Sequence, residues 1–374
     1  MKVIWCPCCL RLEGVAKWNE NDPAIVCRPD FPAHQHPFYV EPYNRRVPTS
    51  KKSPRKKSPS RNARRVKSTG HPAGPRVAPN RPKKVTAGDW IAGARLRTLP
   101  LAIAPVALGT GAATILGSVH DQWPLVALCL AVALFLQIGV NYANDYSDGI
   151  RGTDAFRVGP ARLTGSGAVR PKLVLTVALV FFGLAAAAGI AIVIITQIWW
   201  LLAVGAVAIV AAWFYTGGKR PYGYAGFGEL FVFVFFGLVA TLGTMWVLVR
   251  DISLEGLLAA IAIGFISCAV LMANNIRDIP QDRIAKKKTL AVRVGDRPAR
   301  ILYCVFMLIP FLVVGFLTQL FPLAVLVFFA LLIAIPAGLI VLTAKTPKEL
   351  ILALQLTSLT GLVYGLGLAA AIAF

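Results

Sequence analysis

Long apolar runs, each of about 20 residues, follow one another from residue 99 to residue 373 and are separated by short polar joints. A helical run of that length matches the roughly 30 Å hydrocarbon core of a bilayer. Nine such runs can be counted, at about 99–118, 124–144, 173–195, 198–216, 228–249, 256–276, 301–319, 322–343 and 350–373. The pattern predicts an all-α integral membrane domain over residues 87–374, in which nine transmembrane helices surround a central cavity.

Basic residues in the connecting segments lie on alternate connections. The loops after the second, fourth, sixth and eighth runs carry nearly all of them, and the opposite set of loops contains a single one, Arg250. By the positive-inside rule, the N-terminus and the basic loops are then cytoplasmic and the C-terminus lies outside. Because the alternation holds along the whole domain, it supports the count of nine.

Composition separates a second part from the membrane domain. Of the 374 residues 56% are hydrophobic and 15% are charged, whereas about a quarter of a soluble globule is charged. Residues 1–86 nevertheless hold 19 Lys and Arg against 5 Asp and Glu, with 13 of the 25 prolines. A soluble enzyme, a secreted disulfide scaffold and a fibrous protein are excluded, and we expect residues 1–86 to be a disordered basic tail.

The tail has several interpretations. Its acid-free stretch 49–84 suits either nucleic acid or an anionic membrane surface, and the apolar runs that follow favour the membrane. Two alternatives stay open: an organelle transit peptide, or translation from a start upstream of the true one, which would leave residues 1–86 outside the native protein. Cys6, Cys8, Cys9 and Cys27 lack the spacing of common structural zinc sites.

Two segments dense in carboxylates and amides end the second and sixth runs, at the same predicted face of the membrane. They contain Asn141, Asn144, Asp145, Asp148 and Asp154 in the first segment, and Asn274, Asn275, Asp278 and Asp282 in the second. The pairs Asp145/Asp148 and Asp278/Asp282 are spaced to share a helical face. Carboxylates beside lipid need a compensating partner, and Mg²⁺ takes one or two carboxylates together with substrate phosphates.

Cations are interleaved with these acids, and guanidinium and ammonium groups bind phosphate oxygens. They are Arg157, Arg162, Arg277, Lys287 and Lys288. The pattern therefore predicts a magnesium–diphosphate site that faces the cytoplasm, above an apolar cavity. One alternative is that these are solvated charges at loop ends, and another is a transporter whose carboxylates bind coupling ions. A transporter is expected to have internal repeats and acids near the membrane midplane, and the sequence has no detectable repeat and places its acids at one membrane face.

The motifs Asn144-Asp145-x-x-Asp148 and Asp278-x-x-x-Asp282 resemble those of the UbiA-type intramembrane aromatic prenyltransferases. The resemblance covers residues 89–374, is carried also by the segments 95–100, 215–224 and 228–244, and is greatest to the branch that prenylates 1,4-dihydroxy-2-naphthoate in menaquinone synthesis. The wider superfamily has an Asp where this chain has Gly152. Pro280 is a further departure, since it lets Asp278 and Asp282 share a helix only if it lies in the first turn.

The resemblance implies a multi-pass enzyme of the plasma membrane that transfers a polyprenyl group from polyprenyl diphosphate to 1,4-dihydroxy-2-naphthoate with decarboxylation, giving a demethylmenaquinone. It implies Mg²⁺ on Asp145, Asp148, Asp278 and Asp282, with Tyr215 and Lys219 as further catalytic candidates. The implied substrate-binding residues are Arg95, Asn141, Asn144, Asp154, Arg157, Arg162, Arg220, Asn274, Asn275 and Lys288.

Some features stay open within this resemblance. The acceptor could instead be 4-hydroxybenzoate, homogentisate or a haem, and the length of the prenyl chain is not indicated. Lys219 and Arg220 are expected to line the site because they are the only cations in their loop. Glu229 is expected either to pair with Arg220 or simply to begin its helix. Beyond the two substrates and the lipid bilayer we expect no nucleic acid and no obligate protein partner.

Deletion of residues 1–84 should leave turnover in detergent unchanged, because every motif of the resemblance lies after residue 88. The measurement is the turnover of the truncated and full-length proteins, each shown to be folded by its thermal transition. Loss of turnover in a folded truncated protein would contradict the expectation.

Overall fold

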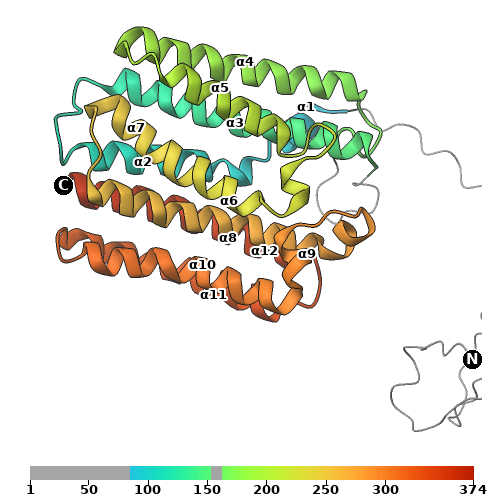
Figure 1. Ribbon diagram of the computed structural model, residues 1–374. Helices are drawn as coiled ribbons and strands as arrows, with labels where there is room; N and C mark the ends of the chain where they lie inside the picture. The colour runs from blue at the N-terminus through green and yellow to red at the C-terminus, as the bar shows by residue number, and fades with distance from the viewer. Residues whose placement is uncertain (1–84, 153–161) are drawn as a thin grey trace, which may run out of the picture. The chain divides into compact units, whose positions relative to one another are not determined.

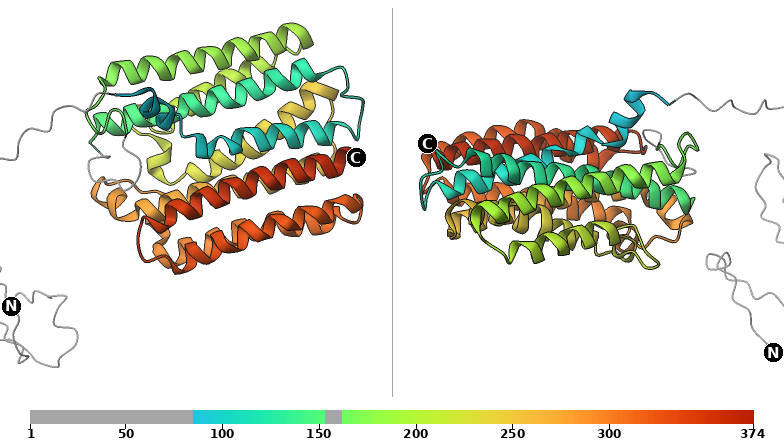
Figure 2. Two further views of the ribbon diagram at one scale, coloured as in Figure 1. Left: turned by 180° about the vertical axis from the view of Figure 1, so that it is seen from behind. Right: turned by 90° about the horizontal axis from the view of Figure 1, so that it is seen from above.

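The structure is a computed structural model that describes residues 85–152 and 162–374. The expected disordered tail and the candidate residues Asp154 and Arg157 lie outside these residues. The described part is helical and contains no strand. Its long helices run roughly parallel to one another, with α4 and α10 at opposite edges of the bundle (Figures 1 and 2).

The helical elements follow the apolar runs closely. They are α1 (Ala87–Gly93), η2 (Leu96–Thr98), α2 (Pro100–Ala113), α3 (Trp123–Ile150), α4 (Pro171–Thr196), α5 (Leu201–Phe214), η3 (Tyr222–Ala225), α6 (Gly228–Val232), the π-helical η4 (Phe233–Val239), α7 (Ala240–Val249), α8 (Leu254–Ile284), α9 (Leu290–Val294), α10 (Asp296–Leu317), η5 (Pro322–Ala330), α11 (Leu331–Thr343) and α12 (Glu349–Ala373).

Seven helical segments of the described chain are long and apolar enough to cross a membrane, and the pair 87–98 and 100–113, bent by 46°, makes an eighth if it counts as one span. The apolar helix α5, with 14 residues, is shorter. Large apolar side chains such as Leu312, Phe329 and Leu332 face outward, where lipid can cover them. The chain is a multi-pass membrane protein.

Helix α8 forms the centre of the bundle. It packs against α2, α10, α12 and η4, and the side chains of Ile263, Ile266 and Met272 are completely buried. The expectation that Pro280 must lie in the first turn of its helix is wrong, because α8 continues past Pro280 to Ile284. Membrane helices tolerate an interior proline where surrounding groups compensate the freed carbonyl, and Pro280 lies only one turn before the helix ends.

Helices α2 and α12 approach each other through glycines. A Cβ atom on Gly111 would lie 2.5 Å from the carbonyl oxygen of Ala369, and one on Gly365 would lie 2.6 Å from the Cβ of Ala104. Small residues at such crossings let two membrane helices approach backbone to backbone, where dispersion forces hold them together. This contact holds the first and last long helices of the domain against each other.

Substitution Gly111→Val should therefore lower thermal stability, because the added side chain must push α12 away; overpacking of this kind costs about 1–3 kcal/mol. The measurement is the thermal unfolding of the protein in detergent. Gly338→Ala is the matched control, since a Cβ there meets nothing within 4 Å. Equal transitions for Gly111→Val and the wild type would refute the close contact.

Candidate active site

A cavity of about 390 Å³ lies within the bundle. Its lining comes from α2, α3, α4, α5, η3, the segment 228–249, α8, α12 and the loop that follows α8. One end is polar, with Asp148, Asp278 and Asp282, and the other is apolar, with Cys129 and Val247. The 19 residues from Cys129 to Asp148 on α3 rise roughly 28 Å at 1.5 Å per residue, so the cavity extends through most of a bilayer core.

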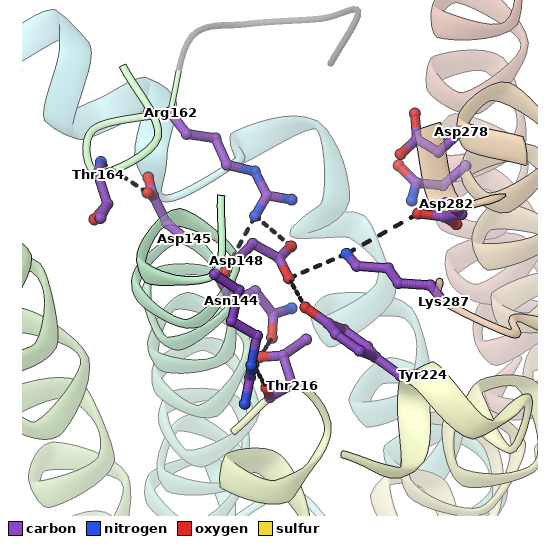
Figure 3. Close-up of polar contacts among 12 residues, drawn as sticks. Asn144, Asp145, Asp148, Arg162, Thr164, Thr216, Tyr224, Asp278, Asp282 and Lys287 are labelled. Atoms are coloured by element: carbon purple, nitrogen blue, oxygen red, sulfur yellow. Dashed lines mark hydrogen bonds and ion pairs between the residues drawn. The ribbon is translucent and has the colours of Figure 1, made fainter. Parts of the chain in front are cut away.

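The Asp148 carboxylate collects donors from three other parts of the chain (Figure 3). The Arg162 guanidinium lies 2.7 Å from Oδ2, and the Lys287 ammonium lies 3.1 Å from Oδ1. The Tyr224 hydroxyl donates to the same Oδ1. Asp148 is only 4% exposed, and a carboxylate buried to this extent is stable only when it is paired with cations and hydrogen-bond donors.

Lys287 joins the two acidic segments. Its ammonium lies 4.0 Å from the Asp282 carboxylate as well as contacting Asp148, and it sits 4.4 Å from the centre of the Tyr224 ring. The Asp278 carboxylate is held by Arg277, whose Nε and Nη2 donate to its two oxygens over 2.7 and 2.6 Å. Carboxylates and cations thus alternate across the polar end of the cavity.

Asp145 faces a different environment from Asp148. Its two oxygens accept hydrogen bonds from the backbone amides of Leu163 and Thr164, each over 2.9 Å, and the residue is 2% exposed. It does not belong to the lining of the cavity. Its carboxylate therefore anchors to α3 the segment that carries Arg162, one turn before Asp148.

Apart from the buried Asp145, the expected site residues of the described part divide into two groups by position. The cavity is lined by Arg95, Asn141, Asn144, Arg162, Tyr215, Asn274 and Asn275, together with Asp148, Asp278 and Asp282. Lys219, Arg220 and Lys288 are exposed and lie outside the lining. The segment 215–224 thus contributes its tyrosines and Thr216 to the cavity, while its two cations face away from it. Burial raises the pKa of Tyr222 in this segment.

Three further polar residues belong to this end of the cavity, and of these only Lys287 was expected to bind phosphate. Tyr224 and Lys287 bind Asp148, and Thr216 donates to the Oδ1 atom of Asn144 over 2.7 Å. Lys287 was expected among the phosphate-binding cations, but no feature of its sequence separates it from its lysine neighbours. Of the two expectations for Glu229, the pairing with Arg220 is wrong and the position at the start of a helix is confirmed. Glu229 lies in the first turn of α6, is buried, and accepts a hydrogen bond from Asn275 on α8, against which α6 packs.

The polar end offers oxygen ligands to a cation. Three carboxylates and several amide oxygens line this end, and no His or Cys side chain lies among them; Cys129 belongs to the apolar end. Among the described residues no three Asp, Glu, His or Cys side chains gather into a ready-made metal site. This donor set fits Mg²⁺, which takes one or two protein carboxylates and completes its shell with phosphate and water oxygens.

Three glycines widen the apolar part of the cavity. Gly189 on α4, Gly205 on α5 and Gly243 on α7 line it, and a Cβ atom built on any of them meets nothing within 4 Å. At these three positions the cavity is wide because the residue has no side chain, and no neighbouring helix packs closely against the glycine.

A helical membrane protein whose cavity joins a charged, oxygen-lined end to a long apolar interior is built to hold an anionic head group together with a hydrocarbon chain. Comparison with known families gives the same class. The chain belongs to the UbiA prenyltransferase family, whose model matches residues 102–372. The resemblance seen in the sequence is confirmed.

Two similar sequences and one similar structure show which members of the family this chain resembles. A Mycobacterium tuberculosis protein named 1,4-dihydroxy-2-naphthoate octaprenyltransferase is 50% identical over 286 residues, which cover 76% of this chain and 97% of that protein. The Escherichia coli protein of the same name is 39% identical over 218 residues, 56% of this chain and 70% of that protein. A UbiA homologue from Archaeoglobus fulgidus bound to GPP and Mg²⁺ has the same fold, with a TM-score of 0.55 at 15% identity over 76% of this chain and all of that one.

Substitution Asp145→Asn should lower stability, because the new NH₂ group faces a backbone N–H that the carboxylate oxygen now accepts. An unsatisfied buried donor costs about 1–3 kcal/mol. The measurement is the thermal transition in detergent without Mg²⁺ or diphosphate. An unchanged transition combined with weaker Mg²⁺ binding would show that Asp145 acts on the metal and does not anchor the loop.

Proposed function

We propose that this protein transfers a polyprenyl group from polyprenyl diphosphate to 1,4-dihydroxy-2-naphthoate, with loss of the carboxylate. The observation that carries the proposal is that paired carboxylates and cations share one cavity with an apolar interior. The mycobacterial relative, at 50% identity over nearly its whole length, supports the choice of acceptor.

The proposed topology has nine crossings, with α5 and the bent pair of α1 and α2 each counted as one. The polar end of the cavity and the N-terminus face the cytoplasm, and the C-terminus lies outside the plasma membrane. The basic loops on alternate connections support this orientation. A cytoplasmic site would receive both anionic substrates from the side of the membrane on which soluble enzymes work.

Asp148, Asp278 and Asp282 are the residues that would hold Mg²⁺, whereas Asp145, the fourth metal candidate from the sequence, would hold the segment of Arg162 in place. Bound Mg²⁺ would neutralise the diphosphate and make it a better leaving group. Lys287, Arg162 and Arg95 line the same end and would bind the phosphate oxygens. The exposed Lys219, Arg220 and Lys288 would draw the anion toward the entrance of the site.

In the chemical step the bond between the allylic carbon and the diphosphate oxygen breaks, and its electron pair leaves with the diphosphate. The ring carbon that bears the carboxylate forms the new bond to the allylic carbon. The carboxylate then leaves as CO₂, and the electron pair of its bond restores the aromatic ring. The product is a demethylmenaquinone in its reduced form.

The protein contributes protection and charge stabilisation to this step. Apolar side chains along the cavity exclude water, which would otherwise capture the allylic cation. Tyr215 also lines the cavity, where its ring can stabilise positive charge. The apolar end would hold the rest of the prenyl chain.

Asp148→Asn and Asp278→Asn should each abolish most turnover, since each removes a charge from the diphosphate site while keeping the side-chain shape. EDTA should silence the wild type, and added Mg²⁺ should restore it. Because these carboxylates act as one unit, the double variant should be little worse than either single variant. Turnover is followed by mass spectrometry of the prenylated product, with naphthoate, 4-hydroxybenzoate and homogentisate offered as acceptors.

The matched control is Asp296→Asn, which alters a half-exposed carboxylate that pairs with Arg300 outside the cavity. It should retain wild-type turnover. Near-normal prenylation by the folded Asp148→Asn and Asp278→Asn variants, or by the wild type in EDTA, would refute the site.

A further inference from the structure

Glu229 is a buried carboxylate that the proposed mechanism does not use. It lies at the start of α6, is 5% exposed, and its Oε1 atom accepts a hydrogen bond from the Nδ2 atom of Asn275 over 2.9 Å. Its Oε2 atom has no hydrogen-bond partner among the described residues. A buried carboxylate is costly to keep in an apolar bundle, which points to a role for the contact with Asn275.

Asn275 itself lines the cavity, just below the acidic end. It precedes Asp278 by three residues on α8, which places it roughly 4.5 Å deeper along the helix axis. Asn275, Asp278 and Asp282 all line the cavity, so they lie on the side of α8 that borders it. Asn275 therefore lies where the diphosphate region ends and the apolar wall begins.

The contact with Glu229 fixes the direction of the Asn275 amide. A side-chain amide has a donating NH₂ group and an accepting oxygen, and a carboxylate oxygen takes the NH₂. The bond to Glu229 is the one hydrogen bond that the side chain of Asn275 makes within the described residues. The amide oxygen is thus left to accept a hydrogen bond from a molecule in the cavity.

Helix α3 also presents an amide to the cavity, of the opposite polarity. Asn144 precedes Asp148 by one turn, and its Oδ1 atom accepts the hydrogen bond from Thr216 (Figure 3). The NH₂ group of Asn144 then remains to donate into the cavity, which Asn144 also lines. Helix α3 thus offers a donor to the cavity and helix α8 an acceptor. The orientation of each amide is fixed by another residue of this chain, Thr216 for Asn144 and Glu229 for Asn275.

We propose that Asn275 binds a ring hydroxyl of the aromatic acceptor through its amide oxygen, and that Glu229 is the positioning residue that holds this amide in the accepting direction. The inference rests on the proposed function and deepens it. An amide oxygen accepts from a hydroxyl and repels a carboxylate, so it orients the ring by its hydroxyl. Accepting that hydrogen bond also enriches the ring in electrons, which favours attack by the ring carbon on the allylic group.

The test measures the KM for each of the two substrates in variants of Asn275 and Glu229. Asn275→Ala and Glu229→Ala should each raise the KM for 1,4-dihydroxy-2-naphthoate about three- to tenfold, the range expected for one lost hydrogen bond. The KM for polyprenyl diphosphate should stay within about twofold of the wild type, because Arg162, Lys287 and the carboxylates are untouched.

Exchanging the amide and the carboxylate between positions 275 and 229 keeps the total charge. It shows whether the contact orients the acceptor or only stabilises the fold. Asn275→Asp alone places two carboxylates against each other and should raise the KM for naphthoate further. Combined with Glu229→Gln, the new amide donates to the aspartate, whose other oxygen again faces the cavity as an acceptor. The double variant should recover most of the affinity that Asn275→Asp loses.

Cys268→Ala is the matched control, since the Cys268 thiol contacts the backbone carbonyl of Glu229 and not its carboxylate. It loosens the same contact between α6 and α8 and should leave both KM values unchanged. A rise in the KM for the diphosphate instead of the naphthoate would overturn the proposal, as would a folded double variant that fails to recover. If the wild-type protein prenylates another hydroxyl-bearing acceptor and not naphthoate, the proposed function is refuted but the role of Asn275 is not. The same KM comparison with that acceptor then decides the role of Asn275.

Discussion

The pairing of the buried Asp148 carboxylate is the interaction on which the site depends. Asp148 belongs to α3, while its partners Arg162, Tyr224 and Lys287 come from three separate connecting segments. A lone carboxylate at this depth would destabilise the bundle, so the requirement to neutralise it brings three loops to one place. The same neutralisation gathers at one end of the cavity the cations and oxygens that a diphosphate needs.

Much of the fold could be predicted from hydrophobic periodicity. The expected apolar runs coincide with helices, and the two acidic segments meet at one cavity as expected from their common membrane face. The spacing of Asp145 and Asp148 was less informative, because side chains three residues apart differ by about 60° around a helix. That difference is enough to direct Asp145 to the backbone at 163–164 and Asp148 into the cavity.

The roles of the three consecutive lysines after α8 could not be read from the sequence. Lys286 has a φ of 56°, in the left-handed region, and this turns the chain where the helix has ended. Lys287 consequently points between the acids while Lys286 and Lys288 remain exposed. Backbone conformation in a short loop decides which lysine enters the site, and three adjacent lysines carry no periodic signal for it. Likewise, burial of Glu229 against Asn275 depends on how α6 meets α8.

The glycines of the bundle differ in what they permit. At Gly111 and Gly365 any side chain must displace a neighbouring helix, so these positions are closed to variation. Gly189, Gly205 and Gly243 border the cavity, and a Cβ atom there meets no neighbouring atom within 4 Å, so alanine at these positions narrows the room for a ligand without displacing a helix. A single added methyl group at any of these three positions can therefore shorten the hydrocarbon that the cavity accommodates, without requiring a helix to move.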